Sequence, residues 1–309
     1  MEYIILLKKR LKRVLIMLLS VSTSPMNVRF SDREAIRLIK EAGFDAYDMS
    51  LCEMMYNPEN IFNTEKYLEE AKSIREYADS LGIVCNQAHA PFHSSCGDPE
   101  KDENTFNMIV RAVEIAAILG AKIIVVHPKQ HLTYADNVEE LFNLNVEFYN
   151  RLIPYCQKFG IKVATENMWQ NNPSSGAITD STCSRSWEFN KYIDAQNSEW
   201  ITGCLDLGHV SLVTKKIPEF IKDMGKERIG ALHVHDTNLK DDSHTVPFNE
   251  RMDYVSIAKA LGEIDYQGDF TYEANNFFRN KPVELIPAAL KYACEVGRYL
   301  ISEIEKARP

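Results

Sequence analysis

Gly120-Ala-Lys-Ile-Ile-Val-Val-His127 joins a glycine, a short apolar run and a side chain that can bind a metal. Glycine suits the left-handed residue that ends a helix before a tight turn, and a short apolar run rich in β-branched residues is typical of a buried strand. The same join recurs as Gly160-Ile-Lys-Val-Ala-Thr-Glu166, Gly203-Cys-Leu-Asp206, Gly230-Ala-Leu-His233 and Gly268-Asp-Phe-Thr-Tyr-Glu273. The pattern therefore predicts a repeated connection from helix to strand.

Amphipathic stretches lie between these strands. Ser31 and Glu34 form a capping box before a helical pattern, and Thr64 to Leu81 has helical spacing. Counted from residue 17, eight strand-then-helix units in about 290 residues suit a closed (β/α)8 TIM barrel better than an open doubly wound sheet. No G-x-G-x-x-G follows the first expected strand, Met17 to Thr23, which disfavours a dinucleotide-binding fold.

Composition bounds the class of protein. The 309-residue chain is 45% hydrophobic and 26% charged, which is enough for one large core in a soluble single domain. Its formal charge of -9 offers no basic surface for nucleic acid or anionic lipid, and no run reaches the roughly 18 apolar residues of a membrane span. We expect a small-molecule substrate and no nucleic-acid or membrane partner. A homo-oligomer is possible.

The first residues differ from the rest. Lys8 to Arg13 is basic and Val14 to Leu19 is apolar, but the apolar stretch does not exceed the roughly 7-residue minimum of a signal peptide and no A-x-A site follows. We expect residues 1–16 to be an N-terminal extension and 17–309 to be the barrel. The seven cysteines have no C-x-x-C spacing, which favours free thiols in a reducing cytoplasm.

Six expected strands end on potential metal ligands. These are His89, His127, Glu166, Asp206, His233 and Glu273. Because the carboxyl ends of parallel barrel strands meet at one face, we expect these side chains to converge at the mouth of the barrel. Taken singly, each glutamate could form a structural salt bridge, and each histidine could be a hydrogen-bonded loop residue. A carboxylate at the end of an apolar strand costs free energy to bury unless it is paired with a cation or bound to a metal.

Four further residues extend this set. His235 shares a strand face with His233, because side chains alternate along a strand. Asp206-Leu-Gly-His209 places an imidazole beside a carboxylate, although a capping aspartate near a surface histidine is the alternative. Asp242-Ser-His244 lies in a polar stretch, where a solvated loop is the alternative.

Taken together, these motifs resemble the xylose isomerase-like TIM-barrel superfamily, which groups sugar isomerases and epimerases, inosose-processing enzymes and apurinic endonucleases of the endonuclease four type. The resemblance covers about residues 17–300 and is most specific in the C-terminal third, in an order similar to bacterial sugar phosphate isomerases/epimerases. Its motifs are Leu205-Asp-Leu-Gly-His209, His233-Val-His-Asp236, Asp242-Ser-His-Thr-Val-Pro247, Asp253-Tyr254 and Gly268-Asp-Phe-Thr-Tyr-Glu273.

The resemblance implies roles for individual residues. Glu166, Asp206, His233 and Glu273 match the metal-binding positions of the epimerases, and His209 matches a histidine beside metal and substrate. In the endonuclease branch, the positions of His89, His127, Asp242 and His244 complete a multinuclear zinc site. Two departures are Lys129-Gln130, where that branch has Gly-Ser, and Glu250, where a glycine is usual; the first argues against a DNA phosphodiesterase.

Three carboxylates and one imidazole suit Mn²⁺, Mg²⁺ or Co²⁺, and Zn²⁺ if more histidines join. Such a cation could polarise the carbonyl of a ketose. We expect Glu166 and Glu273 to be general acids and bases acting through an enediolate, with His209 orienting or protonating an oxygen. This chemistry indicates a metal-dependent isomerase or epimerase of a sugar, sugar phosphate or polyol. A metal-dependent lyase, dehydratase or zinc-dependent phosphodiesterase, and a non-catalytic sugar-binding barrel, are the alternatives.

Other side chains near the expected mouth could hold a substrate. His89, His127, His235, Asp242 and His244 are candidates for substrate contacts or a second metal. Trp169, Phe92, Phe277 and Phe278 are candidate stacking surfaces, unless they only cover the rim of the barrel. Lys129 and Arg279 could bind a phosphate or carboxylate, or could be ordinary surface residues.

Overall fold

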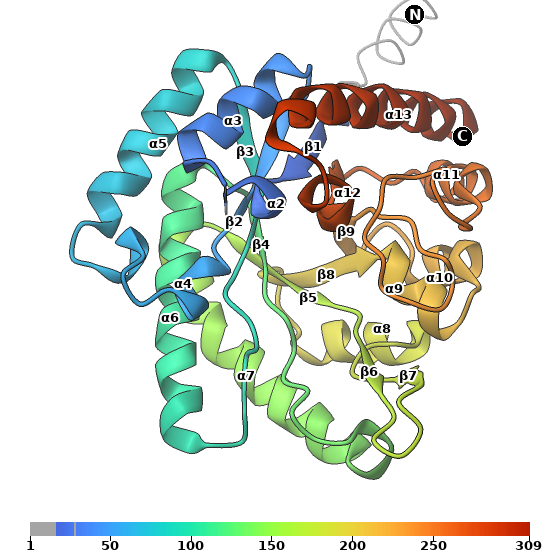
Figure 1. Cartoon of the computed structure of the whole chain (residues 1–309). Helices are drawn as coiled ribbons and strands as arrows, with labels where there is room; N and C mark the ends of the chain where they lie inside the picture. Colours follow the sequence, from blue (N-terminus) through green and yellow to red (C-terminus); the bar gives the residue numbers. More distant parts are fainter. Residues whose placement is uncertain (1–16, 28) are drawn as a thin grey trace, which may run out of the picture.

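A parallel barrel forms the centre of the molecule (Figure 1). The computed structural model describes residues 17–27 and 29–309, so the expected extension at residues 1–16 lies outside the described residues. In sheet order the strands are β10 (Phe270–Tyr272), β1 (Leu19–Ser22), β2 (Ala46–Ser50), β3 (Val84–His89), β4 (Ile123–Val125), β5 (Lys162–Glu166), β8 (Ile201–Asp206) and β9 (Ile229–His233). A parallel bridge between Val234 and Tyr272 closes the circle from β9 to β10. The predicted TIM barrel is confirmed.

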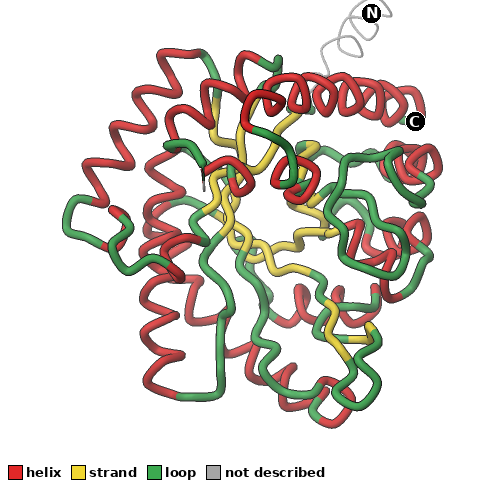
Figure 2. The backbone as a smooth tube through the Cα atoms, in the orientation of Figure 1, coloured by secondary structure: helices red, strands yellow, loops and turns green. Residues whose placement is uncertain are grey.

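Helices surround this barrel (Figure 2). The longer ones are α3 (Asp32–Glu41), α5 (Tyr67–Leu81), α6 (Pro99–Leu119), α7 (Val138–Phe159), α8 (Ser186–Ala195), α10 (Ile217–Met224), α11 (Tyr254–Glu263) and α13 (Ile286–Ala307). Short helical turns occur in the loops: α2 (Ser24–Asn27), α4 (Glu53–Tyr56), η1 (Ile61–Asn63), η2 (Tyr134–Asp136), α9 (Leu207–Val213), α12 (Asn275–Arg279) and η3 (Val283–Leu285). An antiparallel hairpin of β6 (Trp169–Asn171) and β7 (Ile178–Asp180) follows β5. No helix in residues 17–309 combines the length and the apolar character needed to cross a membrane.

Glycine occurs at the predicted helix-to-strand connections for two different structural reasons. Gly120 and Gly160 end α6 and α7 with φ of 94° and 69°, as predicted for left-handed residues after a helix. For Gly203 and Gly230 the prediction was wrong, because both lie inside strands. A Cβ at Gly230 would lie 2.4 Å from Thr202 Cγ2, and one at Gly203 would lie 2.9 Å from the carbonyl oxygen of Arg228. Close strand packing therefore requires glycine there.

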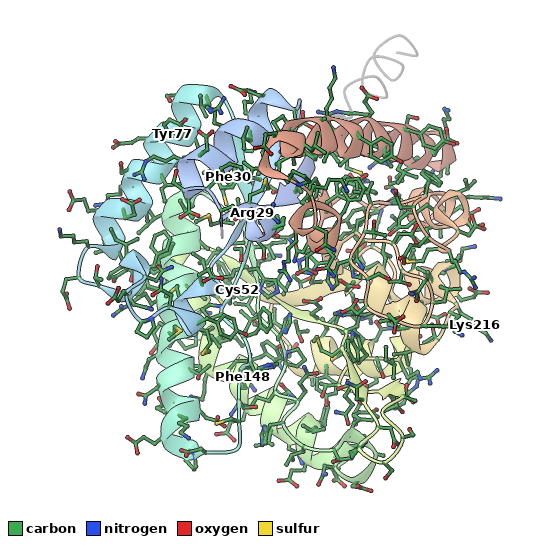
Figure 3. The ribbon with its side chains drawn as sticks, in the orientation of Figure 1. Arg29, Phe30, Cys52, Tyr77, Phe148 and Lys216 are labelled. Carbon is green, nitrogen blue, oxygen red and sulfur yellow. The ribbon has the colours of Figure 1, made fainter. Side chains whose placement is uncertain are left out.

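Apolar side chains fill the layer between strands and helices (Figure 3). Phe148 of α7, for example, packs edge-on against Phe106 of α6, with ring centroids 6.1 Å apart. Inside the barrel the two halves differ. The half made by β4, β5, β8 and β9 contains an apolar cluster of Val125, Ala164, Cys204 and Ala231. The half made by β10, β1 and β3 is polar: Ser20 and Asn86 both donate hydrogen bonds to Thr271 Oγ1.

Candidate metal centre and active site

Four strand ends place metal-binding side chains together at one face of the barrel. β5 ends on Glu166, β8 on Asp206 and β9 on His233, while Glu273 directly follows β10. One ligand atom from each lies within 4.8 Å of the others. Glu166, Asp206 and His233 are fully buried, whereas 15% of the Glu273 side chain is exposed. The structure therefore brings together the four residues expected to form one ligand set.

His233 is the centre of this group. Its Nδ1 lies 3.2 Å from Glu166 Oε1, 3.5 Å from Glu273 Oε2 and 3.9 Å from Asp206 Oδ2. Burial disfavours a charged imidazole, yet Cys204 and the carboxylates of Glu273 and Glu166 raise the pKa of His233 well above its usual value. Converging buried carboxylates repel one another and lose their hydration, so a divalent cation would stabilise them. The donor set fits such a metal.

A second group adjoins Glu166. His127 Nε2 lies 3.1 Å from Glu166 Oε2 and 3.1 Å from His89 Nε2. His89 Nδ1–H can donate to the carbonyl oxygen of Ala90 at 2.8 Å, because that oxygen can only accept, and this leaves Nε2 as an acceptor or ligand. Burial and the neighbouring His127 lower the pKa of His89 to about 4. A neutral imidazole therefore presents its lone pair to His127 and Glu166.

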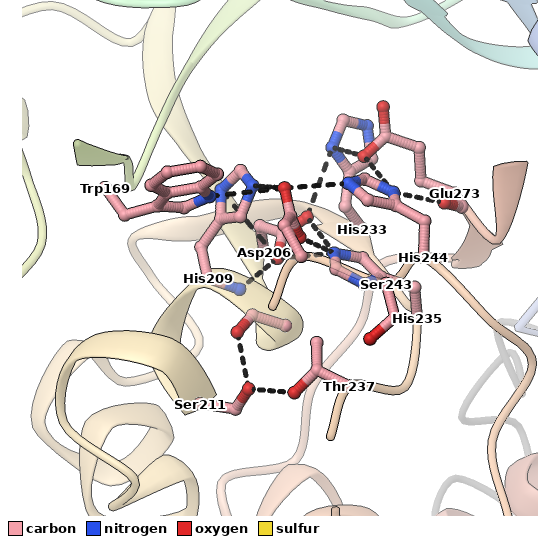
Figure 4. Close-up of polar contacts among 12 residues, drawn as sticks. Trp169, Asp206, His209, Ser211, His233, His235, Thr237, Ser243, His244 and Glu273 are labelled. Atoms are coloured by element: carbon pink, nitrogen blue, oxygen red, sulfur yellow. Dashed lines mark hydrogen bonds and ion pairs between the residues drawn. The ribbon is translucent and has the colours of Figure 1, made fainter. Parts of the chain in front are cut away.

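A third group is formed by His209, His235, Asp242 and His244, which place ligand atoms within 4.8 Å of one another. Figure 4 labels the three histidines of this group. Asp242 Oδ2 lies 3.1 Å from His244 Nε2 and 3.4 Å from His209 Nε2. Burial raises the pKa of a carboxyl group, but these two histidines hold the pKa of Asp242 well below its usual value. In turn, burial opposes charge on His244, and Asp242 raises the pKa of His244 to about 9. The solvated-loop alternative for Asp242 and His244 was therefore wrong.

Neighbouring groups fix the orientation of this third group. His209 Nδ1–H donates to the carbonyl oxygen of Asn167 at 2.8 Å, which turns Nε2 toward Asp242. The indole of Trp169 donates to Asp242 Oδ2 at 3.2 Å. Asp206 accepts the backbone N–H of His209 at 2.6 Å, so it caps α9 while its carboxylate also faces His235 Nε2 at 3.0 Å. Asp206 therefore caps α9 as the alternative had it, but His209 is buried, at 5% exposed, and is not the surface histidine of that alternative.

These groups border a cavity of ≈350 Å³ that opens at the barrel mouth. Phe92, Trp169 and Arg279 line it, as expected of substrate-holding residues. Phe277 and Phe278 do not line it, so their predicted role as stacking surfaces was wrong. The Phe278 side chain is fully buried, and Phe277 stacks on Tyr292 at the outside of α12.

Lys129 does not line this cavity either, because its Nζ lies 3.9 Å from Asp102 and above the Phe148 ring.

The sequence reasoning missed several residues that do line the cavity or lie beneath it. Gln130, Asn275 and Asn276 line it, and their only sequence signal is their position two or three residues after a strand-end ligand. Asp48 of β2 is fully buried in the barrel, neither of its carboxylate oxygens accepts a hydrogen bond, and burial raises its pKa to about 7.

Residues 36–295 match the family model described as xylose isomerase-like TIM barrel. The chain belongs to this family. A putative L-ribulose-5-phosphate 3-epimerase, SgbU of Haemophilus influenzae, is 23% identical over 297 residues, which cover 92% of this chain and 94% of that protein.

Two solved structures share the fold. A D-tagatose 3-epimerase-like protein is 21% identical, with a TM-score of 0.73 over 94% of this chain and 99% of that one. The IOLI protein, solved with a bound zinc atom, is 17% identical, with a TM-score of 0.70 over 94% and 99% of the two chains. At these identities the likeness is one of fold.

Proposed function

We propose that the protein is a metal-dependent isomerase or epimerase of a sugar, sugar phosphate or polyol. The observation that carries this proposal is the convergence of Glu166, Asp206, His233 and Glu273, of which Glu166 and Glu273 line the cavity. Glu166 and Glu273 belong to strands separated by β8 and β9, so they approach the cavity from different directions. The epimerase names of the relatives support the same reaction class.

Glu166, Asp206, His233 and Glu273 would hold the cation, Mn²⁺, Mg²⁺, Co²⁺ or Zn²⁺. When bound, it would supply positive charge to a ketose carbonyl. Glu166 removes a proton from the carbon beside the carbonyl, and Glu273 returns one from another direction, which inverts that carbon through an enediolate. Return to the neighbouring carbon would be isomerisation. His209 Nε2 faces the cavity beside Asp242 and donates a hydrogen bond to a substrate oxygen.

The remaining histidines favour a second candidate, hydrolysis or elimination at a site with several metal ions. His89 and His127 share Glu166 with the first ligand set, and His235, Asp242 and His244 adjoin it through Asp206 and Glu273. Hydrolysis of a phosphodiester would use such clustered cations. Against DNA as the substrate, Arg279 is the only lysine or arginine among the residues that line the cavity.

A solvent-exchange experiment tests the leading proposal. Purified protein is loaded with Mn²⁺, and exchange of substrate C–H with deuterated water is followed for D-tagatose, L-ribulose and L-ribulose 5-phosphate. Glu166→Gln and Glu273→Gln should each abolish exchange while preserving the fold. Glu188→Gln is the matched control, because Glu188 is a buried glutamate outside the site, 2% exposed. Undiminished exchange in both site variants would contradict the assignment.

Metal analysis separates the two candidates. One metal ion per chain with exchange supports the isomerase or epimerase. Three zinc ions per chain, nicking of abasic DNA and no exchange would support the phosphodiesterase instead. The seven cysteines are free and five of them are buried, which agrees with the cytoplasmic location that we propose.

A further inference from the structure

A second cavity of ≈310 Å³ lies beside the first. It is bordered by the loop after β3, the loop after β4 and the β6–β7 hairpin. The two cavities adjoin one another, because both are lined by His93, His127, Gln130 and Trp169. A molecule that reacts above Glu166 and Glu273 could therefore extend past Trp169 into the second cavity.

The second cavity has a different chemical character from the first. Among the residues that the structure describes, no aspartate, glutamate, lysine or arginine lines it. Its hydrogen-bonding groups are amides, imidazoles and hydroxyls. The side chains of His93 and Asn171 make no hydrogen bond in the described part of the chain, and His131 is held through Nδ1 by Ser95 Oγ at 2.6 Å, which leaves Nε2 available. Such donors and acceptors suit hydroxyl groups, whereas a phosphate would find no lysine or arginine among the described residues that line the cavity.

The walls of this cavity are fixed by hydrogen bonds between loops. Gln170 accepts the backbone N–H of Tyr134 at 2.8 Å, which ties the hairpin to the loop after β4. Ser94 Oγ donates to the carbonyl oxygen of His127 at 2.6 Å, which ties the loop after β3 to the same region. Trp169 is held by Asp242 and supplies an aromatic face on which the C–H groups of a sugar ring can lie. The cavity is therefore formed before any ligand arrives.

We propose that this second cavity is a subsite for an uncharged sugar ring joined to the reacting sugar. The substrate is then a ketose that carries a glycosyl group, with the ketose over Glu166 and Glu273 and the second ring beyond Trp169. This inference rests on the proposed isomerase or epimerase activity. It assigns the loops around Asn171 and His131 to substrate selection.

The test compares fructose, leucrose and isomaltulose, the last two being glucosyl-fructoses whose carbonyl and neighbouring hydroxyls are free. Solvent exchange gives kcat/KM, and calorimetry gives Kd for each sugar with the Mn²⁺-loaded protein. We expect at least tenfold higher kcat/KM for one glucosyl-fructose than for fructose. Asn171→Ala and His131→Ala should each lower that ratio and weaken disaccharide binding at least fivefold. Asn143→Ala, an exposed asparagine on α7, is the control and should change neither value.

The outcomes are separable. Equal kcat/KM for fructose and both disaccharides, unchanged in the variants, would overturn the subsite and leave the activity standing. A preference for fructose 6-phosphate that Asn171→Ala abolishes would also overturn it, because the cavity would then bind an anion. Disaccharide binding that depends on Asn171 and His131, without exchange of any sugar, would retain the subsite and reject the proposed chemistry.

Discussion

Replacing Gly208 by alanine should displace the His235 ring from Asp206. A Cβ at Gly208 would lie 1.9 Å from Cε1 and 2.4 Å from Nε2 of His235, whereas ordinary contacts begin at 3.4 Å. The ring must therefore move by about 1.5 Å. It has no free direction, because Nε2 lies 3.0 Å from Asp206 Oδ1 and the ring stacks on His244 with centroids 3.8 Å apart.

The expected cost follows from three effects. Losing a hydrogen bond to a carboxylate costs roughly 1.5–3 kcal/mol. Crowding a fully buried site costs about 1–3 kcal/mol more. Alanine is favoured over glycine by about 1 kcal/mol in a helix, and Gly208 lies in α9, so this effect opposes the others. The net loss in the free energy of unfolding should be about 1.5–5 kcal/mol.

Urea unfolding of metal-free protein measures this loss in Gly208→Ala, His235→Ala and the double variant. Without the imidazole, the new methyl group has space. The double variant should therefore be about 1 kcal/mol more stable than His235→Ala alone, because alanine is favoured over glycine in α9. If Gly208→Ala costs as much in the His235→Ala background as in the wild type, the clash with His235 is not the cause and the reasoning is refuted.

Three more results are expected. Burial raises the pKa of Glu188 to about 7, above its usual value near 4.5, so its stabilising contribution is present in acid and is lost as the pH rises toward 7. From pH 5 to pH 8 the wild type should lose roughly 2–3 kcal/mol relative to Glu188→Gln in urea unfolding, and a constant difference would contradict this. Gly262→Ala should lower the free energy of unfolding by about 1–3 kcal/mol, because its Cβ would lie 2.4 Å from the carbonyl oxygen of Ile304, where α11 packs on α13; an unchanged Tm would contradict it. Mn²⁺ at a hundred times its Kd should stabilise the protein by about 2.7 kcal/mol in thermal unfolding, and Asp206→Asn should remove most of this gain.

The sequence predicted the barrel and the convergence of four potential metal ligands for a local reason. Glu166 and Asp206 each follow an apolar run directly, and parallel strands carry such ends to one face, so no knowledge of distant contacts is needed. The same reasoning located His233 and Glu273.

Other features depend on contacts between distant parts of the chain. Trp169 and Asp242 are 73 residues apart, and only the folded loops join them. Asp48 was missed because the residues of its strand do not reveal that its carboxylate points into the barrel and accepts no hydrogen bond. Phe278 was misassigned because the short helix α12 directs this ring into the core, and hydrophobic spacing over five residues does not define an orientation.

The closure of the barrel has a mechanical consequence. Among the described strands, β9 and β10 meet through the single bridge of Val234 and Tyr272, with hydrogen bonds from Val234 N–H to Thr271 O and from Glu273 N–H to Val234 O. Every other neighbouring pair shares at least three register positions. His233 and Glu273 flank this seam. A cation held by both residues would link β9 to β10, the neighbouring strands with the fewest paired residues. The cation that takes part in the reaction would therefore also help to keep the barrel closed.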